Sequence, residues 1–550
     1  MIALKRSNLS IIISMVILSG VVIGRGIYTY ITGFMTGDEA LYYLSGLKSV
    51  EHGQLIILYP SRYLFQIIIV PIFMLLKIND VHSMIIFATI FAWMWTLPLP
   101  YIIKKITEIF TNEEKTLCFS TLAVPFFPIL TIMSATFVTE PMSVLLVMMA
   151  IYFQLLMIKK LSWKYAVMSG LMFALSSSIR DPYMLLILFN GLLVFAMLLK
   201  KKIPSKIGVP FILTSALGYR IPFSLEDILA LRFTQTIITS IMEKSVIMIN
   251  KILSIFITVT PIATSKTVAE QYPAIYAGEM GLSDPIFNVA LHKIGDGLLA
   301  FFMGLFIGWN PIFTLLGIVG LIISFSRLRK FKLEDVIITS NIMAGFLNYA
   351  IVSYIISIGN VTQITAGLSG IGTIIRTSHT SLPAMFSMRL TLAKLNKKHM
   401  IVIFLIVIVF TGISVRYAFT EFQKGWSGKY VERLTLNYRD PHYRLYEYTE
   451  NTGKTLIFGG HNLVLPQLYL RSRLNVYLSP PVTEEKFLTL LKSENWDTVL
   501  IYGYYHYPME PALKGSFPWY LSLMQNETEI PINVIWDDGE SFLYEIKFRG

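Results

Sequence analysis

The sequence predicts an all-α membrane domain that crosses the bilayer about eleven times, followed by a small α/β domain outside the cytoplasm. Of the 550 residues, 54% are hydrophobic and only 15% are charged. Uncharged apolar runs of about 20 residues recur as far as residue 418, and soluble proteins do not carry such runs. From Glu421 onward the runs shorten to strand length. We therefore expect a membrane domain over residues 1–420 and an extracytoplasmic α/β domain over residues 421–550.

The charges support a multi-pass protein of the plasma membrane. The net charge is +12, but Lys and Arg fall in short clusters between the apolar runs. The positive-inside rule explains this pattern better than nucleic-acid binding does. Lys5 and Arg6 precede the first run, which continues to about Tyr30 without a small-residue cleavage site, so we expect a retained anchor with a cytoplasmic N-terminus. The single cysteine, Cys118, excludes an intrachain disulfide and a CxxC site.

Charge placement also decides which apolar runs are counted as spans. The run Leu64–Leu76 has about 13 residues, fewer than the roughly 17–25 that a span needs. Reading it as a half-inserted or membrane-surface helix keeps the later lysine clusters in inner loops. The expected spans are then about 9–31, 82–103, 115–134, 141–158, 163–179, 183–199, 207–218, 311–326, 335–358, 371–393 and 400–418.

Two outer loops and the C-terminal domain complete the prediction. The loops cover residues 33–81 and 219–310, and the second is expected to hold amphipathic or re-entrant helices. After Glu421, strand patterns at 455–460, 474–478 and 498–502 alternate with helix-like stretches. Residues 533–536 and 541–546 flank Asp538-Gly539, which is a hairpin signal.

The strongest chemical candidate is the acidic pair Asp38-Glu39, just beyond the first span and on its outer side. Adjacent carboxylates can supply a general base for an acceptor hydroxyl, or ligate a divalent cation such as Mg²⁺ or Mn²⁺ beside a phosphate. A solvated loop is the structural alternative for any acidic pair. Here, however, Tyr42-Tyr43 follows almost at once, and a stretch with amphipathic character leads on to His52-Gly53.

Further candidates occur at outer helix ends. Glu140 begins a span, although a carboxylate followed by Pro141 also suits any helix N-terminus. Arg180 ends a span where a guanidinium could bind a phosphate, or pair with Asp181, or extend to the membrane surface.

Three other ionisable residues extend this outer set. Arg376 and His379 lie at the outer end of a later span, and Arg62 adds another cation. Ionisable groups at such depths are functional candidates, although a lone histidine there is often structural.

Several signatures are missing from the sequence. It contains no Walker P-loop, no HExxH and no GxSxG motif. The glycines of 367–372 have the reverse of the dinucleotide spacing and begin an expected span, which indicates close helix packing. We therefore expect no nucleotide cofactor.

The order of these motifs resembles the GT-C membrane glycosyltransferases, especially the dolichyl-phosphate-mannose mannosyltransferase and aminoarabinose transferase branch. The residues that carry the resemblance, over roughly residues 9–400, are Gly37-Asp38-Glu39-Ala40-Leu41-Tyr42-Tyr43, Thr139-Glu140-Pro141, Ser178-Ile179-Arg180-Asp181-Pro182, and Arg376 with Leu382-Pro383-Ala384. Thr377 stands where the family has Tyr, and Asp181 is inserted before Pro182.

The resemblance implies an enzyme that moves a sugar (a hexosyl or pentosyl group) from a polyprenyl-phosphate carrier to an extracytoplasmic lipid, glycan or protein acceptor. Asp38 would be the general base, and Glu39 would support it or bind metal. Glu140 would orient a substrate group. The carrier phosphate would be held by Arg180 and Arg376, with Arg62 and His379 in the same substrate-binding set.

A second resemblance concerns the C-terminal domain. Residues 535–539, Ile-Trp-Asp-Asp-Gly, approach the Trp-Trp-Asp-x-Gly signature of oligosaccharyltransferases, which are also GT-C proteins. Ile535 replaces the first Trp, and the chain continues only to Gly550. Asp-Gly between apolar runs favours the hairpin instead.

Two other functions stay open from the sequence. A transporter or flippase of lipid-linked sugars would place ionisable groups near the midplane and often shows inverted repeats, whereas the acids here are expected outside and no repeat is evident. A non-catalytic scaffold or receptor would depend on a partner of the C-terminal domain.

Overall fold

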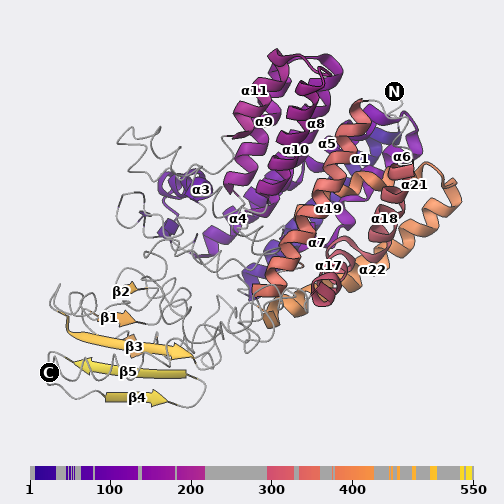
Figure 1. Ribbon diagram of the computed structural model, residues 1–550. Coiled ribbons are helices and arrows are strands. Elements are labelled where there is room, and N and C mark those ends of the chain that lie inside the picture. Colours follow the sequence, from indigo (N-terminus) through magenta and orange to yellow (C-terminus); the bar gives the residue numbers. More distant parts are fainter. Residues whose placement is uncertain are drawn as a thin grey trace.

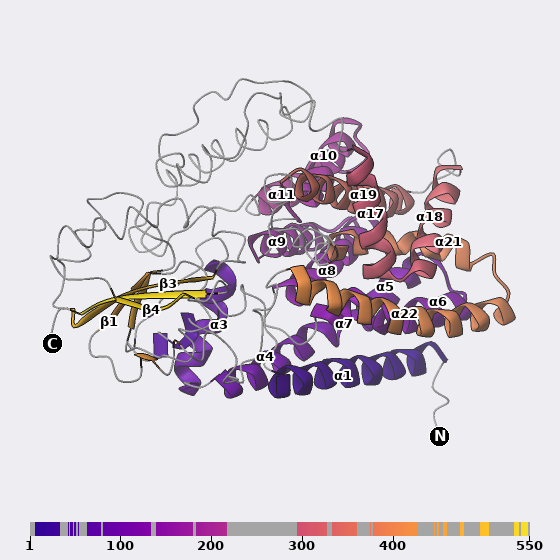
Figure 2. The same cartoon turned by 90° about the horizontal axis from the view of Figure 1, so that it is seen from below.

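A computed structural model gives the structure of the chain. It describes residues 6–32, 42, 45–47, 49–50, 53, 55, 63–78, 81–133, 139–179, 183–216, 294–326, 333–359, 375, 378–425, 445, 448–449, 455–458, 474–477, 496–504, 533–537 and 541–547. The helices gather in one bundle, and a five-stranded sheet lies beyond one side of it (Figure 1). The first helix starts at the end of the bundle away from the sheet (Figures 1 and 2).

The helices of the N-terminal half are α1 (Arg6–Thr32), α3 (Tyr63–Leu76), α4 (Val81–Thr96), α5 (Leu99–Phe110), α6 (Glu114–Leu122), the 3-10 turn η2 (Val124–Phe126), α7 (Pro128–Met133), α8 (Glu140–Lys160), α9 (Trp163–Ile179), α10 (Met184–Leu199) and α11 (Ser205–Ala216). Those that follow are α17 (Ile294–Trp309), α18 (Pro311–Ser326), α19 (Leu333–Gly359), the 3-10 helix η6 (Ser378–Ser387), α21 (Met388–Leu392) and α22 (Lys397–Gly425).

Membrane-spanning character is concentrated in a few of these helices. Within the described residues, the stretches Arg6–Ile27, Ser83–Phe110, Glu140–Lys160 and Lys397–Tyr417 are long and apolar enough to cross a bilayer. Helix α3 has 14 residues, close to the short helix expected there. The total of about eleven crossings stays a prediction.

Two expected spans are not continuous α-helices, so the prediction of one unbroken helix for each is wrong. Residues 115–134 are divided among α6, η2 and α7, because Pro125 and Pro128 lack the N–H that an α-helix needs. Residues 371–393 include η6, a 3-10 helix of 10 residues with Pro383 inside it. Serine side chains of η6 bond nearby carbonyls, as Ser381 does with Ser378 (2.5 Å), which competes with α-helical bonding.

A further difference concerns the end of the expected outer loop 219–310. Residues 294–309 form the apolar helix α17, which meets α18 at a bend of 115°. Asn310 makes the bend with a left-handed backbone, φ 87°. Its side chain amide donates to the Val407 carbonyl (2.8 Å) and to the Thr411 hydroxyl (2.9 Å), so the bend is tied to α22.

The interior of the bundle is closely packed. Trp309 is fully buried and meets Phe127 edge-on, with ring centroids 5.7 Å apart. At Gly170 of α9, an added Cβ would lie 2.7 Å from the Phe211 carbonyl oxygen of α11. The backbones of α9 and α11 therefore approach closely only because this position has no side chain.

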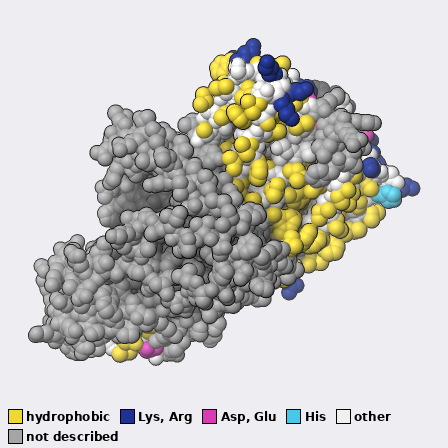
Figure 3. Space-filling view, in the orientation of Figure 1, with side chains coloured by type: hydrophobic (Ala, Val, Ile, Leu, Met, Phe, Trp, Pro, Cys, Tyr) yellow, Lys and Arg dark blue, Asp and Glu magenta, His cyan; other side chains and the backbone are white. Residues whose placement is uncertain are grey.

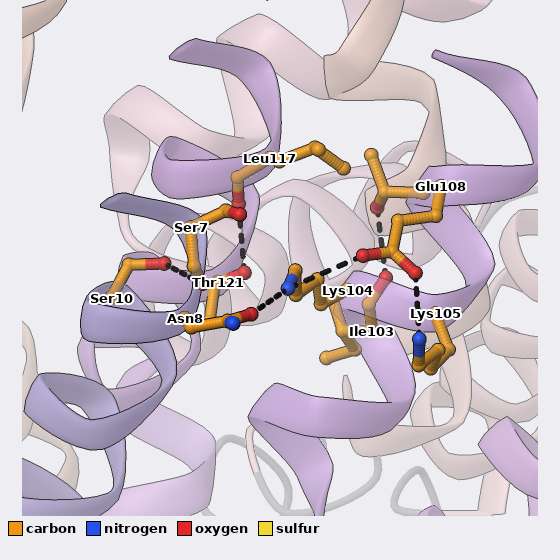
Figure 4. Close-up of polar contacts among 10 residues, drawn as sticks. Ser7, Asn8, Ser10, Ile103, Lys104, Lys105, Glu108, Leu117 and Thr121 are labelled. Atoms are coloured by element: carbon orange, nitrogen blue, oxygen red, sulfur yellow. Dashed lines mark hydrogen bonds and ion pairs between the residues drawn. The ribbon is translucent and has the colours of Figure 1, made fainter. Parts of the chain in front are cut away.

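Basic residues collect at one end of the bundle. Lys104 and Lys105 follow the expected span 82–103 and belong to the lysine clusters expected in inner loops, but both lie in α5, and Lys104 is buried. Its ammonium donates to Asn8 Oδ1 (2.6 Å) and pairs with Glu108 (3.2 Å), which joins α5 to the start of α1 (Figure 4).

Lysines at the neighbouring helix ends belong to the same end. Lys160 ends α8, Lys200 follows α10, and Lys115 donates to the Leu395 carbonyl just before α22 (3.3 Å). In the space-filling view, most Lys and Arg side chains lie at the top and at the right edge, and apolar side chains cover much of the surface between and below them (Figure 3).

The C-terminal strands lie where the sequence predicted strands. They are β1 (Thr455–Phe458), β2 (Leu474–Tyr477), β3 (Thr498–Tyr504), β4 (Asn533–Asp537) and β5 (Ser541–Lys547), in the order β2-β1-β3-β5-β4. Strand β1 is parallel to both β2 and β3, whereas β4 and β5 form the antiparallel hairpin expected around Asp538-Gly539. The expected helices between the strands lie outside the described residues.

Candidate functional site

The structure describes two of the predicted site residues, Glu140 and His379. The other predicted site residues lie outside the described residues: Asp38, Glu39, Arg62, Arg180 and Arg376.

Glu140 is the first residue of α8 and is fully buried. The Thr139 hydroxyl donates to Glu140 Oε2 over 3.4 Å. Thr139 is buried too, and its carbonyl oxygen accepts bonds from the backbone N–H and the hydroxyl of Ser143 (3.1 and 2.9 Å). A helix N-terminus favours negative charge, so this position suits a carboxylate. Because α8 ends at Lys160, Glu140 lies at the end of the bundle opposite the lysines.

His379 belongs to η6 and is also fully buried. Its ring meets Tyr183 edge-on, with centroids 5.4 Å apart. The Tyr183 hydroxyl donates to the His379 backbone carbonyl over 3.3 Å. This contact joins η6 to the residue that precedes α10. Arg180 and Arg376, which are predicted to bind phosphate, come three positions before Tyr183 and His379 in the sequence. Segments next to both arginines therefore touch.

A buried apolar cluster joins neighbours of the remaining site residues. It contains Tyr42, Phe65, Met142 and Ile179. Tyr42 and Phe65 meet edge-on, with ring centroids 5.0 Å apart. Each of them is close in sequence to a different predicted site residue. Tyr42 follows the Asp38-Glu39 pair and Phe65 follows Arg62. Met142 follows Glu140, and Ile179 directly precedes Arg180.

Three amides on α8, α10 and α19 form a ring of hydrogen bonds, and along α8 this ring lies nearer the lysine-rich end than the apolar cluster does. Gln154 of α8 donates to Asn190 of α10 (2.9 Å), Asn190 donates to Asn341 of α19 (3.1 Å), and Asn341 donates back to Gln154 (3.0 Å). All three side chains are fully buried. Each asparagine also donates to a carbonyl of its own helix, to Leu186 and Ile337 respectively (2.9 and 3.0 Å).

The amide ring was missed by the sequence reasoning, although a signal existed. Lone Asn and Gln residues inside apolar helices are expected to bond across helices. What the sequence does not show is which of them meet.

The described residues contain no group of three or more His, Cys, Asp and Glu side chains that could hold a metal ion. The predicted cation ligands Asp38 and Glu39 are not among them.

No protein-family model and no curated protein matches the sequence. Solved structures do match. The oligosaccharyltransferase of Archaeoglobus fulgidus, in its apo form and as AglB with an inhibitory peptide and a dolichol-phosphate, is 11% identical with a TM-score of 0.53. Either match covers 98% of this chain and 74% of that one. The same enzyme complexed with Zn and sulfate has a TM-score of 0.50 at 11% identity, covering 97% and 72% of the two chains.

ArnT from Cupriavidus metallidurans, bound to undecaprenyl phosphate, is also 11% identical, with a TM-score of 0.41 over 99% of this chain and 98% of that one. At these identities the comparison supports a similar fold only. The oligosaccharyltransferase matches, with TM-scores of 0.53, provide that support. The chain therefore shares the fold of the archaeal oligosaccharyltransferase, and the sequence analysis expected a fold of this kind because it grouped oligosaccharyltransferases with the GT-C proteins.

Proposed function

We propose that this chain, which shares the GT-C fold, is a membrane glycosyltransferase that moves a sugar from a polyprenyl-phosphate carrier to an extracytoplasmic acceptor. One observation carries the proposal. Neighbours of Asp38, Arg62, Glu140 and Arg180 meet in a single apolar cluster, and neighbours of Arg180 and Arg376 meet at the Tyr183–His379 contact. Successive Cα atoms are about 3.8 Å apart, and these four residues and Arg376 are one to four positions from the neighbours named, so we expect them to lie near the same contacts.

In the proposed reaction, the acceptor hydroxyl oxygen attacks the anomeric carbon while the bond from that carbon to the carrier phosphate breaks. The hydroxyl proton passes to the Asp38 carboxylate, and the electron pair leaves on the phosphate. Arg62, Arg180 and Arg376 would stabilise the negative charge that develops there, with His379 in the same binding set. Glu140, a buried carboxylate, would orient a substrate hydroxyl.

A divalent cation, Mg²⁺ or Mn²⁺, fits the proposed residues. Carboxylate oxygens are the ligands that these hard cations prefer, and Asp38 and Glu39 would hold the ion. Glu140, a buried carboxylate at the end of the bundle opposite the lysines, would offer further oxygen donors if Asp38 and Glu39 lie at that end. A bound cation would neutralise charge on the carrier phosphate, as a Lewis acid does.

The orientation in the membrane is part of the proposal. The lysine-rich end carries the starts of α1 and α22 and the end of α8. By the positive-inside rule this end would face the cytoplasm, with the sheet domain and the Glu140 end outside.

The alternative is a flippase of lipid-linked sugars, and the 115° break between α17 and α18 is one feature that favours it. Broken helices are frequent at the substrate sites of transporters. The two functions differ in whether a glycosidic bond is broken.

The experiment that tests the proposal uses the purified full chain in nanodiscs with a panel of labelled polyprenyl-phosphate hexoses and pentoses. We expect release of sugar, by hydrolysis or transfer, from one class of donor. Asp38→Asn should lower this rate by about 10²- to 10⁴-fold while expression and membrane insertion persist. Glu114→Gln, an exposed carboxylate at the opposite end, is the matched control. Full activity in Asp38→Asn would refute the assignment of the base. Lipid movement across vesicles without any covalent product would favour the flippase.

A further inference from the structure

Asn348 of α19 is a fully buried amide whose polar atoms have no hydrogen-bond partner among the residues that the structure describes. Its exposed fraction is 0%, and neither its oxygen nor its nitrogen has a hydrogen-bond partner within the described part of the chain. Most buried polar side chains in proteins are hydrogen-bonded, so each exception calls for a physical reason. Inside an apolar bundle the reason is sharper, because lipid offers no replacement partner.

Helix periodicity gives the direction of this side chain. Residues seven apart lie on the same face of an α-helix, about 10 Å apart along its axis. Asn348 is seven residues beyond Asn341, which bonds to Asn190 and Gln154. Asn348 therefore faces the space between α8 and α10, one level above the closed amide ring.

The same spacing identifies the facing residues. Helix α10 ends at the lysine-rich end, whereas α19 starts there, where Asp335 pairs with Arg389 (3.3 Å), so the two helices are antiparallel. Seven residues before Asn190 is Tyr183, in helical backbone just ahead of α10. On α8 the corresponding position, seven before Gln154, is Val147.

Continuing outward along α8, the next residue on this face is Glu140. By this spacing, the three helices carry polar groups in successive levels: the amide ring, then the level of Asn348 and Tyr183, then Glu140. Each amide of the lowest level donates one bond and accepts one bond within the ring. The level above it contains the unsatisfied amide.

The chemistry of the amide selects the kind of group that would complete it. A side-chain amide offers an N–H donor and a carbonyl acceptor together. An ionised phosphate or carboxylate only accepts hydrogen bonds, so it would leave the carbonyl oxygen of the Asn348 amide without a donor. A hydroxyl both donates and accepts, and sugars present several hydroxyls on one small ring.

We propose that Asn348 recognises a hydroxyl of the carried sugar, and is a specificity-determining residue one level above the amide ring. The inference rests on the proposed function for its substrate class. We expect the arginines to hold the lipid phosphate further out. Asn348 should therefore contact the sugar and make no contact with the polyprenyl-phosphate carrier.

The melting temperature of an Asn348 variant distinguishes a role in sugar recognition from a role in holding the fold together. An unsatisfied buried amide destabilises the folded state, so replacing it with an apolar side chain of similar size removes that cost. We expect Asn348→Leu to keep or raise the melting temperature. Asn341→Leu is the contrasting control, because it leaves Gln154 and Asn190 without their partner and should lower the melting temperature.

The test measures binding first, with the full chain in nanodiscs and two probes: a short-chain polyprenyl-phosphate hexose and the same polyprenyl phosphate without sugar. Wild type should bind the sugar-bearing lipid about 10- to 100-fold more tightly. Asn348→Leu should lose most of that preference while its affinity for the sugar-free lipid is unchanged. Asn348→Ala is the second variant in case leucine does not fit.

Deoxy analogues of the hexose then identify the hydroxyl. One of them should lose the preference in wild type and make no further difference in Asn348→Leu, as in a double-mutant cycle. The inference is overturned if Asn348→Leu keeps the preference, in which case the amide holds an internal water only. It is also overturned if the variant lowers the melting temperature, or if wild type has no preference for the sugar. A preference that depends on Asn348 without any sugar transfer would instead remove the transferase proposal and leave this inference standing.

Discussion

The hydroxyl of Tyr183 donates to the backbone carbonyl oxygen of His379 over 3.3 Å, although the two residues are 196 positions apart in the chain. Their rings also meet edge-on. This contact connects the start of α10 to η6, whose ten residues are all buried. Any ligand that binds both Arg180 and Arg376 would depend on the relative position of these two segments.

Removing the Tyr183 hydroxyl should therefore weaken donor binding more than it slows the reaction. We expect Tyr183→Phe to raise the KM for a polyprenyl-phosphate sugar about 5-fold with kcat within about twofold, and to cost about 1 kcal/mol of stability. Tyr165→Phe is the control, because the Tyr165 hydroxyl bonds Lys160 at the opposite end (3.2 Å). An unchanged KM in steady-state kinetics would contradict the idea that this contact holds the site together.

The amide ring of Gln154, Asn190 and Asn341 should show strong non-additivity. A single change, Asn190→Leu, leaves two buried amides short of partners and should cost about 1–2 kcal/mol. Replacing all three residues with leucine removes the unsatisfied groups, so the triple variant should be more stable than the single one. Thermal unfolding in detergent measures both. A triple variant less stable than Asn190→Leu would show that the ring stabilises the fold by more than removing unpaired amides.

The bend between α17 and α18 should depend on Asn310 in two separable ways. Asn310→Gly loses the bonds to Val407 and Thr411 but tolerates the left-handed backbone. Asn310→Ala loses the same bonds and also strains the backbone at φ 87°, so it should be less stable than the glycine variant by about 1 kcal/mol. Equal melting temperatures for the two variants would mean that the bend relaxes when the side chain is lost.

Sidedness can be tested with single cysteines after Cys118→Ala removes the native thiol. Lys201→Cys lies at the exposed lysine-rich end, and Val534→Cys lies on β4, where the native side chain is 60% exposed. A membrane-impermeant maleimide should label Val534→Cys on intact cells and Lys201→Cys only after permeabilisation. Labelling of both from the same side would overturn the proposed topology and, with it, an extracytoplasmic site.

Local patterns in the sequence were sufficient for several elements. Helix α3 follows from one short apolar run, and the start of α8 follows from Glu140-Pro141. The β4–β5 hairpin follows from two apolar runs around Asp538-Gly539. Each of these depends on residues close together in the chain, where turn chemistry and run length dominate. A fold like that of the oligosaccharyltransferase was also foreseen, from the order of the motifs along the sequence.

Only the tertiary structure decided the interior. Hydropathy says that residues 371–393 are apolar enough for a span, but it does not reveal η6, whose 3-10 form depends on Pro383 and on serine bonds to nearby carbonyls. Hydropathy also does not reveal that Gln154, Asn190 and Asn341 meet, or that Asn348 has no hydrogen-bond partner in the described part of the chain. These facts depend on which helix faces lie against one another, and that is a property of packing between distant segments, which no local run of residues encodes.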